Sequence, residues 1–235
     1  ESFKLGSLKR TDEDNKAYSN PDNDPKGPWR SGDVRNALYR PNLIFDIVSP
    51  SGKIIKPCEN GWRWSKETID EKISTGEIIF NKDETRIIRK IYLSTLEGRA
   101  PETIWFGKDV GTTREGVSEL KKLFGQAPFD TPKPTRLLER CITLMNDKEM
   151  LVMDFFSGSA TTSDAVMQMN AEDGGHRTYI QIQYPEECEK TSSAYKQGYK
   201  TISEIGKERI RRAGDKIKEE NPLGTQNLDI GFRVF

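Results

Sequence analysis

The sequence predicts an α/β protein in which a partial Rossmann-like sheet follows a smaller α+β module rich in hairpins. Three observations predict this fold. Residues 150–154 form a short apolar run, expected to be a buried strand, that ends at Asp154; small residues follow, and a helical pattern begins near Thr161. Residues 177–183 then alternate like a second strand, which completes a βαβ unit whose ligands bind at the carboxyl ends of the strands. Earlier, residues 42–94 carry hairpin signals.

Length and composition limit the classes of protein to consider. The 235 residues suffice for two small domains, and we expect the parts to be residues 1–126 and residues 127–235. Lys and Arg (37) balance Asp and Glu (37), so a DNA site, if present, must be a local patch. The three cysteines are too far apart for a zinc site, and no apolar run could cross a membrane. We therefore expect a cytoplasmic protein without a metal site.

The N-terminal module is predicted from turn and cap signals. Residues 1–40 are polar and rich in turn residues, so we expect an extended, partly mobile segment. Residues 42–56 form a hairpin around Ser51-Gly52, and Ser65 caps a short helix over 66–76. Residues 77–80 and 86–94 then form an outgoing and a returning strand.

Basic and aromatic residues alternate on this module and are candidates for contacts with DNA phosphates and bases. The candidates are Arg30, Trp62, Arg63, Trp64, Arg86 and Arg89. The competing interpretation is a solvated charged face, with the tryptophans, and Trp29 beside Arg30, anchoring loops onto the core.

Helices dominate the second part. One is expected over 115–125 and another after Pro134, with Leu138, Cys141, Ile142 and Met145 on one buried face. The helix of the βαβ unit buries Ala165, Val166 and Met169. A long helix is expected over 195–219, and its charged, solvent-facing side carries Lys207, Arg209, Arg211 and Arg212. Residues 228–235 are expected to form a final strand, and the only histidine, His176, to be an exposed turn residue.

The turn after Asp154 favours one class of nucleotide ligand over another. Dinucleotide sites use G-x-G-x-x-G, whereas residues 157–162 contain a single glycine, Gly158. A pyrophosphate needs more exposed backbone than this turn provides. Phe155 and Phe156 instead favour a ligand with an apolar, sulfonium-bearing tail, namely S-adenosylmethionine.

A wider set of motifs resembles a known family. FDTPKPTRLLERCI, DFFSGSATTSDAV and GGHRTYIQIQYPEE occur in this order, together with GWRWSKE, TIWFGKDVG and GFRVF. This pattern resembles the adenine-specific DNA methyltransferases of the β class and, more narrowly, the modification subunit of type III restriction–modification systems. The resemblance covers nearly the whole chain.

The resemblance implies a set of S-adenosylmethionine contacts. Thr131 and Lys133 should lie at the methionine end, and Gln183 should meet the ribose hydroxyls. Ala160 stands where a glycine is more usual, and it requires a negative φ or a small strain. The implied cofactor residues are Phe129, Asp130, Thr131, Lys133, Asp154, Phe155, Phe156, Ser157, Gly158, Ser159, Ala160, Thr161, Thr162 and Gln183.

The family's catalytic motif is an Asp, Asn or Ser followed by Pro-Pro and an aromatic residue, and this sequence has no Pro-Pro dipeptide. We therefore expect a carboxyl-terminal fragment whose catalytic half lies upstream, with no catalytic residue of its own and with an unpaired strand edge and an open cofactor site. The implied partners are double-stranded DNA, a restriction subunit and a second modification subunit. Two alternatives stay open: a non-catalytic DNA-binding or subunit-docking module, and a nicotinamide-dependent oxidoreductase.

Overall fold

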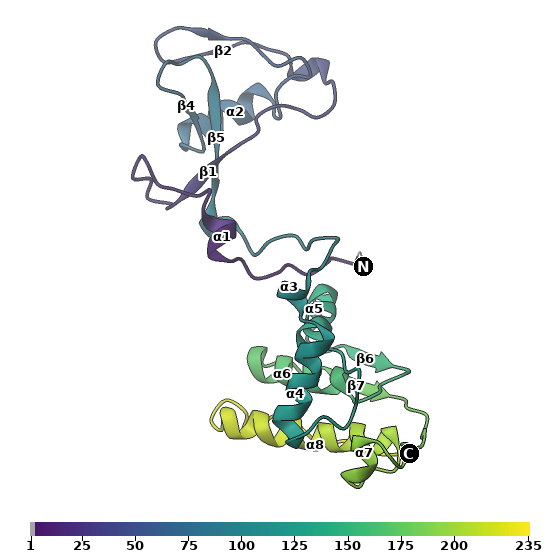
Figure 1. Ribbon diagram of the computed structural model, residues 1–235. Coiled ribbons are helices and arrows are strands. Elements are labelled where there is room, and N and C mark those ends of the chain that lie inside the picture. The colour runs from purple at the N-terminus through teal and green to yellow at the C-terminus, as the bar shows by residue number, and fades with distance from the viewer. Residues whose placement is uncertain (1–2) are drawn as a thin grey trace. The chain divides into compact units, whose positions relative to one another are not determined.

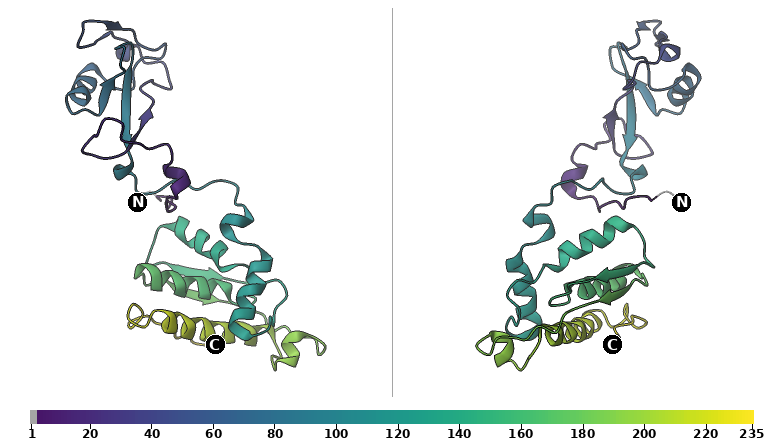
Figure 2. Two further views of the ribbon diagram at one scale, coloured as in Figure 1. Left: turned by 60° about the vertical axis from the view of Figure 1, so that its left-hand side comes forward. Right: turned by 90° about the vertical axis from the view of Figure 1, so that its right-hand side faces the viewer.

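The computed structural model describes residues 3–235, which form two compact units (Figures 1 and 2). One is Lys9–Arg99, and the other combines the segment up to Leu8 with Ala100–Phe235. This division precedes the expected boundary after residue 126, because helices α3 (Gly107–Val110) and α4 (Thr113–Phe124) pack on α5 (Thr135–Met145) and α8 (Ile202–Glu220) of the second unit. The functional assignment of the two parts remains a proposal.

The unit Lys9–Arg99 is built on an antiparallel sheet in the order β1-β5-β4. A separate hairpin, β2–β3, turns at Ser51-Gly52 as the sequence predicts, and Ser65 caps α2 by accepting a hydrogen bond from the Thr68 N–H at 3.4 Å. The elements are α1 (Asp12–Asn15), β1 (Trp29–Gly32), the 3-10 helix Pro41–Leu43, β2 (Ile47–Val48), β3 (Ile54–Ile55), α2 (Lys66–Ser74), β4 (Ile78–Phe80), β5 (Ile87–Tyr92) and the 3-10 helix Leu93–Thr95.

Strand β1 lies in the segment that we expected to be extended and partly mobile, and it corrects that expectation. It pairs with β5, and the turn before it is tied to the same strand because the Lys90 ammonium contacts Asp22 and Asp24. The Trp29 indole N–H donates to Asp22 at 2.8 Å, and Lys90 lies over the Trp29 ring. These contacts support the interpretation of Trp29 as an anchor.

The second unit contains the βαβ arrangement. Strands β6 and β7 are parallel, with Asp154 opposite Gln181, and α6 lies between α5 and α8 (Figures 1 and 2). Its further elements are α5 (Thr135–Met145), β6 (Leu151–Asp154), α6 (Thr161–Asp173), β7 (Thr178–Gln181), α7 (Ser193–Lys196) and α8 (Ile202–Glu220). The mixed α/β architecture is confirmed, whereas a larger Rossmann-like sheet is not shown, because within residues 3–235 this sheet has two strands.

One face of the β6–β7 sheet is covered and the other is open. Ala165 and Val166 are buried in α6 as predicted, and Val152 and Tyr179 pack on that core. On the opposite face Leu151, Met153, Ile180 and Ile182 are 43–56% exposed. The expectation of a buried strand is therefore wrong for β6, because the described residues place no second layer over this face.

Three other expectations need correction. Cys141 and Met145 are exposed, so of the four residues expected on the buried face of α5 only Ile142 is buried, and Leu138 is half-buried. The long helix is broken into α7 and α8, because Thr201 and Glu204 form a capping box that starts α8 at Ile202.

The segment 228–235 forms no strand, and it instead packs Ile230 and Phe232 against a core cluster of α6 and α8. Among residues 3–235 there is no helix with the length and apolar character that a membrane crossing needs.

Candidate functional site

The turn after β6 is held by the aspartate that ends the strand. Asp154 Oδ1 accepts the Phe156 N–H at 3.2 Å, and Oδ2 accepts the Thr162 hydroxyl at 2.6 Å. One carboxylate therefore fixes both the start of the turn and the first helical turn of α6. Because both carboxylate oxygens accept hydrogen bonds from the protein, Asp154 holds the turn in its conformation.

Residues that follow β7 accept hydrogen bonds from the same turn. The Gly158 N–H donates to Gln183 Oε1 at 2.7 Å, and the Ser157 N–H donates to the Ile182 carbonyl at 3.2 Å. Gln183 also donates from Nε2 to the Tyr184 carbonyl. Since an amide oxygen has two lone pairs, Gln183 can still accept a further hydrogen bond from a ligand hydroxyl.

The segment 129–133 reaches the turn from the other side. The Phe129 ring lies 3.4 Å from the position that a Cβ on Gly158 would take. The Thr161 hydroxyl donates to the Lys133 carbonyl at 3.3 Å. The two motifs assigned to one ligand thus lie side by side, although twenty residues separate them in the chain.

Ala160 ends the turn in a left-handed conformation, with φ 61° and ψ 39°. Of the two expected outcomes, the small strain is the one observed. Its methyl group is buried, and Gly206 of α8 lies opposite, where a Cβ would stand 3.4 Å from the Ala160 Cβ. The lack of a side chain at Gly206 allows α8 to pack closely on the turn.

A buried arginine links the turn to both neighbouring helices, and sequence analysis missed it. Arg209 is 0% exposed, which corrects its assignment to the solvent-facing side of the helix. Its guanidinium contacts Asp164 at 2.9 Å and donates to the Thr161 hydroxyl at 2.8 Å and to the Thr135 hydroxyl at 3.2 Å. Arg209 therefore holds the first turns of α5 and α6 together. The charged residues around it favoured a charged face, although Arg209 lies four residues from the buried Ile205 and four from the buried Ala213, a spacing that places all three on one side of the helix.

Carboxylates surround this arginine. Glu119 lies 3.6 Å from the Arg209 guanidinium and also accepts the hydroxyl and N–H of Thr135. Burial, with Asp164 and other carboxylates nearby, raises the pKa of Glu139 to about 7. The cluster thus contains more carboxylates than its one buried cation can balance.

The expected cofactor residues fall into three groups by burial. Ser159, Ala160, Thr161 and Thr162 are buried and support the turn. Phe155 (59% exposed) and Phe156 (88% exposed) are open to solvent. Asp130, Thr131 and Lys133 are also exposed, whereas Phe129, Asp154, Ser157, Gly158 and Gln183 are half-buried.

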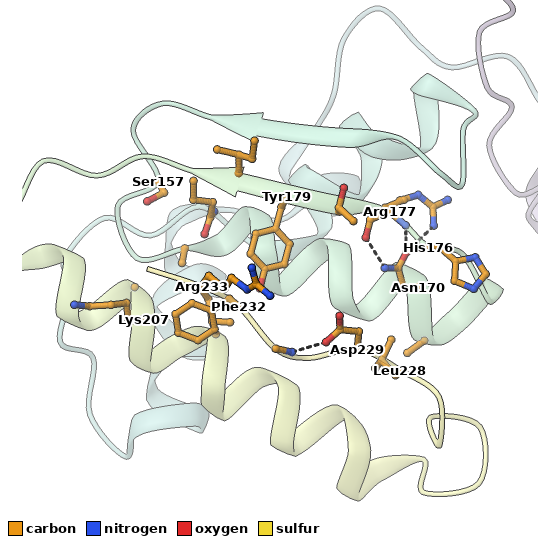
Figure 3. Close-up of a pocket in the computed structure, with 18 of the residues that line it drawn as sticks. Ser157, Asn170, His176, Arg177, Tyr179, Lys207, Leu228, Asp229, Phe232 and Arg233 are labelled. Carbon is orange, nitrogen blue, oxygen red and sulfur yellow. Dashed lines mark hydrogen bonds between the residues drawn. The ribbon is translucent and has the colours of Figure 1, made fainter. Parts of the chain in front are cut away.

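A groove of about 1220 Å³ adjoins the turn (Figure 3). It runs beside β7, between α8 and the segment 223–235, and Ser157, Ala160 and Gln183 line one end. Tyr179 points from β7 towards Phe232 (Figure 3). The Tyr179 hydroxyl and both polar atoms of the Gln181 amide are buried without a hydrogen-bond partner in the protein. The groove therefore offers polar groups that a ligand or water could satisfy.

His176 lies at the far end of the groove as an exposed residue, with Nδ1 3.0 Å from a Glu149 oxygen. Its side chain is 78% exposed, as expected for a turn histidine. Within residues 3–235 there is no group of three or more His, Cys, Asp or Glu side chains that could hold a metal ion.

The structure separates the candidate DNA contacts of the other unit. Trp62 is 3% exposed, and its indole N–H donates to the Phe45 carbonyl at 2.7 Å, so it is a core residue. Arg63 and Arg89 instead lie over the Trp64 ring, and Arg30 is exposed on β1. Arg86 is exposed just before β5.

Comparison with known proteins identifies the class to which this fold and site belong. A DNA methylase family model matches residues 14–211, which is most of the chain. The chain therefore belongs to this DNA methylase family.

The curated relatives narrow the class. The chain is 36% identical to the type III restriction-modification enzyme StyLTI Mod subunit of Salmonella typhimurium, over 94% of this chain and 33% of that protein. It is 34% identical to the EcoPI Mod subunit of Escherichia phage P1, over 84% of this chain and 29% of that protein. It is 32% identical to the type II methyltransferase M.KpnI of Klebsiella pneumoniae, over 76% of this chain and 42% of that protein. The resemblance to type III modification subunits is thereby confirmed, and the chain spans about a third of the length of the Mod subunits that it matches.

Proposed function

We propose that this chain is the S-adenosylmethionine-binding part of a DNA adenine-N6 methyltransferase of a type III restriction–modification system. The observation that carries the proposal is the meeting of the turn 154–162 with the segment 129–133, through Phe129 on Gly158 and Thr161 on Lys133. Family membership and the Mod relatives support the reaction and the DNA substrate.

The residues at this meeting point fit the cofactor. Bound S-adenosylmethionine supplies an electrophilic methyl group. Thr131 and Lys133 would hold its methionine end, since an ammonium group attracts a carboxylate. The second lone pair of Gln183 Oε1 is available to the ribose hydroxyls, and the unpartnered Gln181 amide lies along the adjoining groove.

The chain's own residues would bind and orient the cofactor, and no catalytic residue is assigned among them. A Rossmann-like sheet with further strands beside β6 and β7, a restriction subunit and a second modification subunit belong to the same proposal. The open apolar face formed by Leu151, Met153, Ile180 and Ile182 favours the second candidate function, a subunit-docking module that keeps the fold.

Calorimetric titration of the chain separates these functions. We expect saturable binding of S-adenosylmethionine or S-adenosylhomocysteine, lost in Asp154→Ala, because that change frees the turn from both of its carboxylate contacts. Asp215→Ala, which removes an exposed carboxylate of α8, is the matched control and should bind normally. DNA binding without cofactor binding would favour the docking module, and a preference for NADH would contradict both.

A methyl-transfer assay tests whether this chain, proposed to bind the cofactor, lacks the residues needed for catalysis. Residues 1–235 are expected to transfer no tritiated methyl group to DNA, since no Pro-Pro-aromatic motif is present to hold the target amino group. Methylated adenine in the product would refute this part of the proposal.

A further inference from the structure

Arg30, Arg63 and Arg89 form an arginine cluster in the unit Lys9–Arg99. Arg30 and Arg89 belong to the sheet and lie on the face that packs on the core. In the antiparallel register Arg30 is opposite Ile91, and Arg89 is opposite both Gly32 and Ile78. Directly paired residues point to the same side of a sheet, and residues two apart on a strand do so as well. Arg30 and Arg89 therefore share a face with the buried Ile78 and Ile87.

Trp64 is the centre of this cluster. The Arg89 guanidinium lies 5.2 Å from the centroid of the Trp64 ring, the Arg63 guanidinium 5.5 Å and the Lys72 ammonium 5.7 Å. Gly32 leaves room for this arrangement, since a Cβ there would stand 3.2 Å from Arg89 Cδ. Cation–π contacts of this kind restrict where an arginine side chain can go.

The charge of the cluster is not neutralised within the described residues. Arg30, Arg63 and Arg89 form no ion pair there, and the Arg30 Nε donates to the uncharged Tyr18 hydroxyl. Glu77 is the neighbouring carboxylate, and it is already shared by Lys72 at 2.7 Å and Lys26 at 3.8 Å.

The charges of the neighbouring arginines also affect the pKa of Arg89. Burial and, next, the charge of Arg63 lower the pKa of Arg89; Glu77 opposes them, and the charge of Arg30 adds a smaller lowering. Neighbouring positive charges on a half-exposed surface are stabilised when an anion binds to them. The planar guanidinium group matches the geometry of phosphate oxygens.

We propose that Arg63 and Arg89, which lie over Trp64, together with Arg30 on the same sheet face as Arg89, bind phosphates of the DNA backbone. The identity of the ligand rests on the proposed function, and the site rests on the cluster. Trp64 acts here as a positioning residue, since its ring is occupied by cations and is not free to stack on a base. The contact is therefore independent of DNA sequence and adds affinity to whatever reads the bases.

Fluorescence anisotropy of the whole chain with two unrelated DNA duplexes, over a range of salt concentrations, tests the proposal. Arg63→Ala and Arg89→Ala should each weaken binding by about fivefold, equally for both duplexes, and lower the slope of log K against log salt by about 1. Arg89→Lys keeps the charge and should retain most of the slope. Arg40→Ala removes an exposed arginine of the same unit outside the cluster, and it should leave both quantities nearly unchanged.

The tryptophan gives a separate readout. Trp64→Leu leaves every charge in place but loosens the arginines, so affinity should fall by about twofold to threefold while the salt slope stays the same. A fall in slope equal to that of Arg63→Ala would contradict the positioning role.

Three results would overturn the phosphate site. One is equal weakening by Arg40→Ala and Arg63→Ala, and another is no DNA binding by the unaltered chain. The third is competition by polyglutamate as strong as that by DNA at equal charge, which would identify an acidic protein as the ligand. S-adenosylmethionine titration of the same samples is independent of these results, so failure of the DNA site is distinguishable from failure of the proposed cofactor function.

Discussion

Arg209 in one unit and Arg89 in the other are both withdrawn from bulk water, yet their charges are met in opposite ways. Arg209 is fully buried and contacts Asp164, with Glu119 nearby. Arg89 is half-buried, lies on Trp64, and has two further arginines around it. An arginine whose charge is balanced internally holds other parts of the protein in place. An arginine whose charge is left unbalanced is available to a ligand from outside.

The largest expected effect follows from removing Arg209, the cation that balances the carboxylates around it. Arg209→Ala leaves Asp164 as a buried charge without its cation, and we expect the free energy of unfolding to fall by about 3–5 kcal/mol. Urea denaturation followed by circular dichroism reports on this unit, which contains α4, α5, α6 and α8. Arg211→Ala, the exposed neighbour in α8, and Arg63→Ala in the other unit should each change stability by less than about 0.5 kcal/mol. A loss of several kcal/mol in Arg63→Ala would remove the contrast between the two clusters.

Trp62 and Trp64 allow the same comparison, between a residue that stabilises the fold and one that positions a ligand site, within the unit Lys9–Arg99. Trp62→Phe leaves the Phe45 carbonyl without its indole donor and creates a small void, so we expect a loss of about 2 kcal/mol. Trp64→Phe keeps an aromatic face under the arginines and should lose less than about 1 kcal/mol. Thermal unfolding followed by tryptophan fluorescence compares them, and equal losses would mean that Trp64 is also a core residue.

The acidic excess around Arg209 predicts a pH-dependent effect of intermediate size. The pKa of Glu139 is raised by burial and by Asp164 to about 7 from 4.5, so the folded state binds more protons than the unfolded state between these values. Its contribution to stability is complete below the unfolded value and is lost as the pH rises through the folded value. Glu139→Gln should therefore stabilise the protein by about 1–2 kcal/mol near pH 8.5 and by almost nothing near pH 4.5. A stabilisation of equal size at both pH values would show that carboxylate charge is not the cause.

The smallest expected effect concerns the strained turn. Ala160 has a positive φ, and Ala160→Gly relieves a strain of about 1 kcal/mol but loses a buried methyl group of nearly the same value. We expect a net stabilisation of less than about 1 kcal/mol, measured as a small rise in the melting temperature. A drop of more than about 1 kcal/mol would show that packing of the Ala160 methyl group against α8 outweighs the backbone strain.

Sequence patterns predicted the elements that are encoded locally. Ser51-Gly52 marks a turn, Ser65 caps a helix, and residues 154–162 combine a strand end with a helix start, so a window of about ten residues contains the whole signal. The contact between the segment 129–133 and the turn 154–162 is not encoded locally, and it was expected because the family resemblance assigns both segments to one ligand.

Features set by distant partners could not be predicted in this way. Trp29–Gly32 contains no alternating pattern, and it becomes a strand because β5 pairs with it from about sixty residues away. The burial of Arg209 depends on hydroxyls and carboxylates supplied by other helices, and Trp62 and Trp64 differ in role although they are almost adjacent. The segment 228–235 has a strand-like pattern, but within the described residues no strand pairs with it.

The Gly6 N–H donates to the Leu144 carbonyl at 2.9 Å, so the first described residues belong to the same unit as Ala100–Phe235. The unit Lys9–Arg99 is therefore an insertion, and both of its ends join one host. During synthesis the host cannot be completed until the inserted unit has emerged, and an insert that folds first shortens the loop that the Gly6–Leu144 contact must close. An insertion of this kind can also be exchanged as a cassette without interrupting the helices of its host, so the surface of the unit Lys9–Arg99 can vary while the host stays unchanged.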